Sequence, residues 1–72
     1  YMLGKFKKAE SYLKIAVELM PEDPIVNDHY GDILWKSNKP LQATYAWKYV
    51  LSLKNTNSEM KEKIKRKIVF GI

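Results

Sequence analysis

The sequence predicts an all-α fold built from antiparallel helix-turn-helix repeats and closed by a C-terminal capping helix. In successive segments, apolar residues recur every three or four positions, which is the period of a helix with one buried face. Proline, asparagine or glycine separates these segments. No stretch alternates between apolar and polar residues for long enough to predict a strand. The chain has 72 residues, of which 46% are hydrophobic, so we expect one small folded domain.

The central segment, residues 23–38, is predicted to form a helix with a neighbouring helix on each side. Asp23 is suited to cap its N-terminus, and Pro24 occupies the first helical position, where no N–H is needed. Gly31 lies mid-helix, where glycine costs about 1 kcal/mol relative to alanine, so we expect another helix to pack too closely there for a side chain. Asn38 is expected to end the helix in the left-handed conformation. The inward-facing stripe comprises Val26, Tyr30, Ile33, Leu34 and Ser37.

Two flanking helices are expected at residues 6–19 and 40–53. Residues 1–4 are predicted to be the tail of a preceding helix that ends at Gly4. Pro40 is expected to open the later helix, because a proline disfavours the helical conformation in the residue before it. The inward-facing residues of the two helices are Phe6, Ala9, Leu13, Ala16 and Val17, and then Leu41, Thr44, Trp47, Val50 and Leu51.

The last segment is predicted to form a basic amphipathic helix over residues 58–70, ended by Gly71. Thr56 and Glu59 have the spacing of a capping box, in which each side chain bonds to the backbone N–H of the other residue. Residues 54–72 contain six Lys or Arg and two Glu, which accounts for most of the net charge of +5. The apolar residues of this helix recur at four-residue steps: Met60, Ile64 and Ile68.

A shift of the chain against itself by 34 residues aligns residues of similar character. Repeats of this length are typical of stacked helical hairpins. The aligned pairs are Gly4 with Asn38, Ala9 with Ala43, Leu13 with Trp47, Ala16 with Val50, and Leu19 with Leu53.

These residues resemble the tetratricopeptide repeat family, and the resemblance covers residues 1–53. The stretch from Gly4 to Pro21 is similar to the second half of one repeat, and Pro24 begins the next, with Tyr30-Gly31 in place of the family's Leu-Gly pair. The resemblance implies the C-terminal part of an array. Its parts are residues 1–23, half a repeat; residues 24–55, a second repeat; and residues 56–72, a basic capping helix. Departures from the family pattern occur at Asn27, Asn38 and Asn55.

The resemblance implies a protein–protein interaction module, a scaffold that binds a partner segment in a concave groove. Family members that bind C-terminal carboxylates carry Lys and Asn on that face, whereas this chain has Asp28 and Asp32 there, so a basic or aromatic peptide is the expected partner. Two alternatives remain for Trp35: it anchors the partner, or it packs against Tyr1 or the neighbouring helix. The expected groove residues are Ile25, Asp28, Asp32, Trp35 and Lys36.

No catalytic, cofactor-binding or metal-binding residue is predicted. His29 is the only histidine and the chain has no cysteine, so His29 has no companion of the type that holds a transition metal. Asp28 and Asp32 are one helical turn apart, and paired carboxylates are able to do acid–base work. With no further ligand in the sequence, we expect them to form a solvated or partner-facing patch, and we do not expect an enzyme.

Two other partners follow from surface patterning. The basic residues 61–67 make a nucleic-acid-binding helix the alternative function, and such a run also suits contact with an acidic membrane surface. Lys and Arg on the outer face of a terminal helix nevertheless commonly serve solubility, which is the role we expect. The helix over residues 6–19 is expected to lack a covering partner on one side, which predicts self-association. No long apolar run is present, so we expect no membrane partner and a cytoplasmic location.

Overall fold

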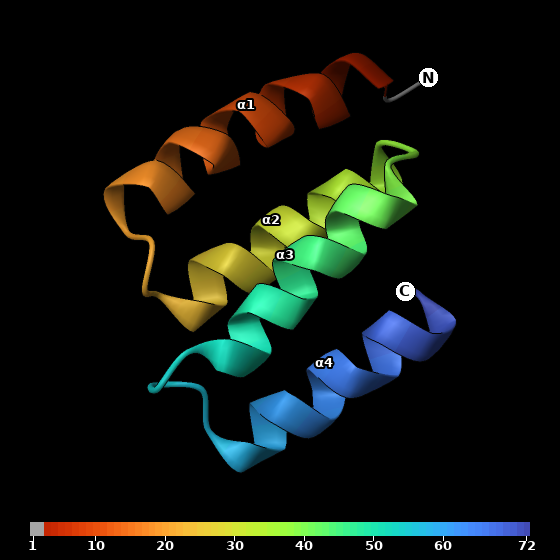
Figure 1. Ribbon diagram of the computed structural model, residues 1–72. Helices are drawn as coiled ribbons and strands as arrows, with labels where there is room; N and C mark the ends of the chain where they lie inside the picture. The colour runs from red at the N-terminus through yellow and green to blue at the C-terminus, as the bar shows by residue number, and fades with distance from the viewer. Residues whose placement is uncertain (1–2) are drawn as a thin grey trace.

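The computed structural model describes residues 3–72 and contains four helices. They are α1 (Leu3–Leu19), α2 (Pro24–Lys36), α3 (Pro40–Ser52) and α4 (Ser58–Phe70). Consecutive helices run in opposite directions (Figure 1), with α2 packed between α1 and α3, and α4 packed on α3. No strand occurs in residues 3–72, so the all-α prediction is confirmed.

Local signals define the ends of α2 as predicted. The Asp23 carboxylate accepts hydrogen bonds from the backbone N–H groups of Ile25 and Val26 at 2.9 and 3.1 Å. Asn38 adopts the left-handed conformation, with φ of 63°. Asn27, which stands where the repeat family has a large apolar residue, is buried and donates to the backbone oxygens of Pro21 and Asp23. The Asn27 amide therefore ties the α1–α2 turn to the first turn of α2.

The core forms where Trp47 of α3 packs against the backbone of α2. A Cβ built on Gly31 would lie 2.4 Å from Trp47 Nε1, which confirms that the glycine admits a close neighbour. Trp47 is fully buried, as predicted. The buried cluster comprises Leu34, Ala43, Trp47, Val50 and Ile64.

The predicted helix stop at Gly4 is wrong, because Gly4 lies inside α1. Neither proline nor a polar turn follows Gly4, so the helix tolerates its conformational cost of about 1 kcal/mol. The remainder of that predicted tail, Tyr1 and Met2, lies outside the described residues.

The predicted capping box at the start of α4 is also wrong. Asn57 is the N-cap, and its Oδ1 accepts from the N–H of Met60 at 2.8 Å. The buried Thr56 hydroxyl instead donates to the carbonyl of Val50 at 2.7 Å, so it ties the α3–α4 loop to the end of α3. Glu59 is exposed.

Leu41 is 66% exposed and does not belong to the buried stripe of α3. The buried positions of that helix centre on Ala43 and Trp47. Leu41 is two positions before Ala43, about 200° around the helix, so it faces away from the core. In the described residues, no helix is both long and apolar enough to cross a bilayer.

Candidate functional site

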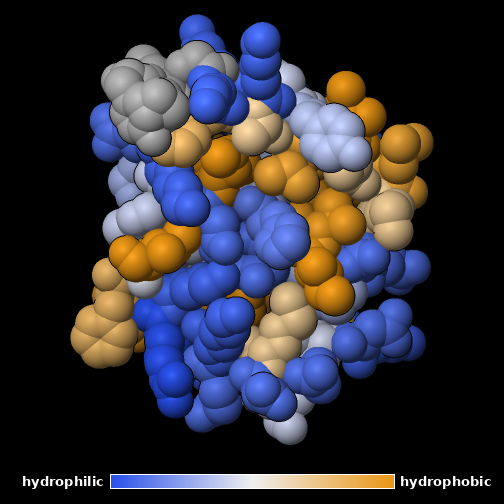
Figure 2. Space-filling model, turned by 180° about the vertical axis from the view of Figure 1, so that it is seen from behind, coloured by the Kyte–Doolittle hydropathy of each residue, from blue (hydrophilic) through white to orange (hydrophobic). Residues whose placement is uncertain are grey.

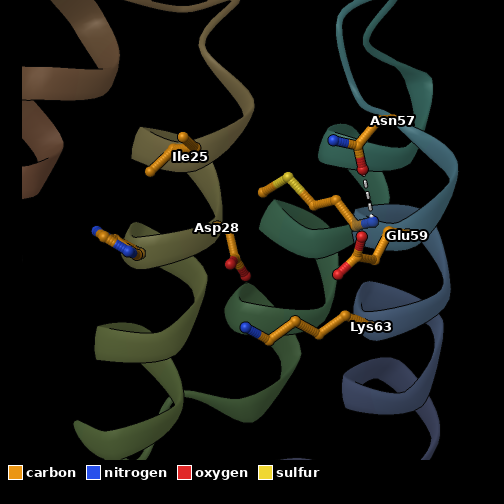
Figure 3. A pocket seen from close by; sticks show the side chains of 7 residues that line it. Ile25, Asp28, Asn57, Glu59 and Lys63 are labelled. Carbon is orange, nitrogen blue, oxygen red and sulfur yellow. Dashed lines mark hydrogen bonds between the residues drawn. The ribbon is translucent and has the colours of Figure 1, made fainter.

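A hollow of about 370 Å³, which we call the α2–α4 groove, opens between α2 and α4. Figure 3 shows Ile25 and Asp28 on α2 facing Glu59 and Lys63 on α4, with Lys63 extended toward Asp28. The hydrogen bond between Asn57 and Met60 lies at the edge of the hollow. The lining residues are Ile25, Asp28, His29, Asn57, Glu59, Met60 and Lys63.

The two carboxylates of α2 do not form a solvated patch, because both pair with a lysine of α4; the other expectation for them, a partner-facing patch, stays a prediction. Lys67 Nζ lies 2.8 Å from Asp28 Oδ1 and 2.9 Å from Asp32 Oδ1. Asp28 is only 6% exposed. A single lysine from α4 therefore bridges both carboxylates and fixes α4 to α2.

The protonation of Lys67 reflects two opposing influences. Burial disfavours the charged ammonium, but the hydrogen bonds and negative charges of Asp28 and Asp32 outweigh it, so the pKa of Lys67 is raised above 10.5. Lys67 is therefore cationic at neutral pH. With both carboxylates ionised, the three groups carry a net charge of minus one.

Trp35 packs against the neighbouring helix, which is one of the two alternatives left by the sequence. Its ring centroid is 5.8 Å from that of Trp47, with the planes tilted by 32°. On its other side, a Cβ built on Gly71 would lie 2.2 Å from Trp35 Cζ2. Trp47 Nε1 also donates to Asp32 at 3.2 Å. This bond links the aromatic pair to the cluster of Asp28, Asp32 and Lys67. The alternative contact of Trp35 with Tyr1 lies outside the described residues.

The five predicted groove residues are separated by the structure into three groups. Ile25 and Asp28 line the hollow. Asp32 and Trp35 lie further along α2, where Lys67 and the packed tryptophans engage them. Lys36 is exposed at the end of α2.

Sequence reasoning missed five of the residues that line the groove. Four of them belong to the α4 side of the hollow, and their role depends on where α4 packs, which the helical pattern alone does not specify. His29, one residue after Asp28, is exposed. These missed residues are His29, Asn57, Glu59, Met60 and Lys63.

A second hollow, of about 330 Å³, lies between α1 and α3, and residues of α2 also line it. Aromatic and aliphatic side chains dominate it, including Val17, Tyr45 and Tyr49. Burial, together with nearby Glu10 and Glu18, raises the pKa of Tyr30 in its wall, so this phenol stays neutral well above pH 7. Hydrophobic side chains are also exposed on the outer side of α1, namely Tyr12, Ile15 and Leu19.

The described residues define an all-α protein of antiparallel helical hairpins with an open groove. Within residues 3–72, no group of three or more His, Asp or Glu side chains is placed to hold a metal ion. No protein-family model, no curated protein and no solved structure matches the chain.

Proposed function

We propose that this chain is a protein–protein interaction module that holds a segment of a partner protein in the α2–α4 groove, without catalysis. The observation that carries the proposal is the hollow itself, which is walled by two different helices and open to solvent. Its lining combines apolar surface from Ile25 and Met60 with hydrogen-bonding groups from His29 and Asn57. Concave sites of this mixed character are typical of recognition surfaces.

The walls of the groove are held in place before any partner arrives. Ile64 is fully buried, and Lys67 joins α4 to the two carboxylates of α2. Asn57 and Thr56 fix the loop that leads into α4. A site that needs little ordering on binding loses less affinity to conformational entropy, so the groove is suited to equilibrium binding of an extended segment.

A basic segment with an aromatic or aliphatic neighbour fits the chemistry of this groove. The Asp28, Asp32 and Lys67 cluster retains one negative charge, and Glu59 adds a second at the rim. Lys63 offsets one of these charges, which leaves a modest negative potential. One cation in the partner would meet Glu59, while its apolar neighbour would contact Ile25.

The same observations support a helical-repeat assignment of the tetratricopeptide type. A shift of 34 residues moves α1 onto the span of α3, and Ala43 and Trp47, the counterparts of Ala9 and Leu13, are both fully buried. In this assignment α4 is the capping helix that covers α3, and the groove between α2 and α4 is the concave face.

The proposal is tested with linear peptides selected from a random library on the wild-type protein. Their affinity is then measured by fluorescence anisotropy for Glu59→Lys and for the control Glu62→Lys. Both substitutions change the charge of α4 equally, but Glu62 does not line the groove. We expect Glu59→Lys to weaken binding of basic peptides about tenfold and Glu62→Lys to have little effect.

Equal loss in the two variants would contradict binding in the groove, as would failure of the library to yield any binding peptide. Ile25→Ser is a second probe, because Ile25 is 58% exposed and we expect its replacement to leave the fold intact. Unchanged affinity in Ile25→Ser would also count against the proposal.

The alternative, nucleic-acid binding through α4, has less support. The ammonium of Lys67 is engaged by two carboxylates and is not available to phosphate. Lys65 has Glu62 as a neighbour at 3.5 Å. The basic run therefore presents fewer cations to a nucleic acid than its sequence suggests.

A further inference from the structure

Folding gathers the positive charge of this chain at one end of the molecule. Because consecutive helices run in opposite directions, the first halves of α1 and α3 and the second halves of α2 and α4 share an end (Figure 1). We call this the basic end; it comprises residues 3–10, 31–44 and 65–72. The start of α1, the α2–α3 turn and the chain's C-terminus all lie there, at the right of Figure 1.

The charge difference between the two ends is large for so small a chain. The basic end contains eight Lys or Arg and two carboxylates, whereas the remaining residues contain five Lys or Arg and six carboxylates. Both carboxylates of the basic end are already paired, Glu10 with Lys39 at 2.6 Å and Asp32 with Lys67. The basic end therefore carries a net charge of +6, and the remaining residues carry −1.

Large apolar side chains project from the same end. Val69, Phe70 and Ile72 are 72%, 81% and 60% exposed, and we call these three residues the apolar tip. Lys65 and Arg66 lie one helical turn before Val69 and Phe70, so each cation is a surface neighbour of an apolar residue. Figure 2 shows hydrophobic and strongly hydrophilic side chains bordering one another at its left edge, near the C-terminal end.

The apolar tip is held on a fixed part of the fold. Lys67 turns inward to α2, which anchors the last turn of α4. The N–H of Gly71 donates to the carbonyl of Lys67 at 2.8 Å, and Gly71 packs beside Trp35. No residue of the tip lines the α2–α4 groove or the hollow between α1 and α3. The tip is therefore a projection presented outward.

We propose that the basic end docks on an anionic lipid surface, with the apolar tip entering the boundary between headgroups and acyl chains. The exposed cations Lys5, Lys36 and Arg66 would face the lipid phosphates and carboxylates. Peripheral attachment commonly combines a small apolar insertion with a polybasic patch, because neither alone is sufficient. This departs from the sequence-based expectation of no membrane partner, since the charge asymmetry exists only after the helices pack.

The apolar tip favours lipid over the other anionic partners. The phosphate backbone that a basic patch contacts offers the apolar side chains of the tip no apolar surface. A stable protein interface commonly buries about 1,200–2,000 Å² with complementary pockets, whereas this tip is three projecting residues. A lipid surface accommodates such a projection without a preformed pocket.

The test is co-sedimentation of the wild-type chain with vesicles at low salt. The probes are vesicles of phosphatidylcholine containing about 30% phosphatidylserine, and vesicles of phosphatidylcholine alone. We expect binding to the anionic vesicles to be at least about tenfold tighter, and to be lost at about 0.5 M NaCl because salt screens the surface charge.

Matched variants locate the contact. Lys5→Glu with Lys36→Glu changes two exposed cations of the basic end, and the control, Lys14→Glu with Lys54→Glu, changes two exposed cations elsewhere by the same net charge. We expect the first pair to lower vesicle affinity at least about tenfold and the control pair to lower it less than about threefold.

A second matched pair probes insertion of the apolar tip. Phe70→Ala removes an exposed aromatic ring from the tip, whereas Leu19→Ala removes a similarly exposed side chain from the far end of α1. We expect only Phe70→Ala to weaken binding, by about fivefold or more. Far-ultraviolet circular dichroism of each variant checks that the helices remain.

Three outcomes would overturn the proposal. The first is no binding of the wild-type chain to anionic vesicles. The second is an equal loss of vesicle affinity in the two charge variants, which would show that binding depends only on the net charge of the molecule. The third is preferential binding to a generic DNA duplex that displaces the chain from vesicles, which would assign the basic end to nucleic acid.

Discussion

Lys67 Nζ lies 2.8 Å from Asp28 Oδ1, so two residues that are 39 positions apart in the sequence join α4 to α2. The lysine side chain is 12% exposed and the aspartate side chain 9% exposed, so the pair is largely removed from water. Asp32 also pairs with Lys67, and it accepts a hydrogen bond from the indole N–H of the buried Trp47. This cluster sets the position of α4 and, with it, the width of the α2–α4 groove.

Removal of the lysine is expected to destabilise the fold strongly. Lys67→Met would leave Asp28 and Asp32 with no cation, and breaking a buried ion pair from one side costs about 3–5 kcal/mol. Since Asp32 keeps partial access to water, we expect a loss of about 2–4 kcal/mol in the free energy of unfolding, measured with urea.

The control for this substitution is Lys65→Met, which removes an exposed lysine from the same helix. We expect it to change stability by less than about 0.5 kcal/mol. Similar values for the two variants would show that the bridge does not hold α4. The combined variant Lys67→Met with Asp28→Asn should recover part of the loss, because one unpaired charge has been removed.

The same cluster predicts a loss of stability at alkaline pH. The pKa of Lys67 is raised in the folded state, so the folded chain holds its proton more tightly than the unfolded chain does. Its contribution is fully present below the ordinary value of 10.5 and is lost as pH rises through the raised pKa. The measurement is the free energy of unfolding between about pH 9 and pH 12.

Tyr30 complicates this profile, because its raised pKa produces a loss in the same direction. We therefore compare wild type with Tyr30→Phe, which removes the phenol and leaves the raised pKa of Lys67. The alkaline loss should persist in Tyr30→Phe. A profile that becomes flat in Tyr30→Phe would assign the whole effect to the phenol.

Helix ends were predictable from the sequence where the deciding bonds are local. Asp23 caps α2 through residues two and three positions later, and Asn38 and Gly71 adopt positive φ at the stops expected of them. Thr56 shows the limit, because Thr56 and Asn57 are both good N-caps. The Thr56 hydroxyl donates to the buried carbonyl of Val50, so Asn57 is the residue that caps α4.

The candidate site was less predictable, because it depends on how α4 packs. Asp28 lines the α2–α4 groove, but nothing near it in the sequence indicates that it pairs with Lys67. Trp35 packs against the ring of Trp47, a contact that the sequence offered as only one of two alternatives. The α4 residues that line the groove, including Glu59, could not be predicted, because they depend on where that helix packs.

Gly31→Ala tests the close approach of α3 to α2. Alanine is favoured over glycine within a helix by about 1 kcal/mol, but its Cβ would lie 2.4 Å from Trp47 Nε1. Overpacking of a core costs about 1–3 kcal/mol, so we expect a net loss of up to about 2 kcal/mol in thermal or urea unfolding. An increase in stability would show that the indole has room to move.

Thr56→Val tests the contact that displaced the predicted capping box. The valine keeps the shape of threonine but removes the hydroxyl that donates to the buried carbonyl of Val50 at 2.7 Å, so this carbonyl keeps only the N–H of Leu53, at 3.1 Å. Net loss of one hydrogen bond costs about 0.5–1.5 kcal/mol. The control is Thr44→Val, because the Thr44 hydroxyl donates to Pro40 at 2.9 Å in an exposed position where water replaces it. We expect urea unfolding to show a loss for Thr56→Val that exceeds the loss for Thr44→Val by at least about 0.5 kcal/mol; equal losses would mean that the Thr56 hydroxyl does not fix the loop before α4.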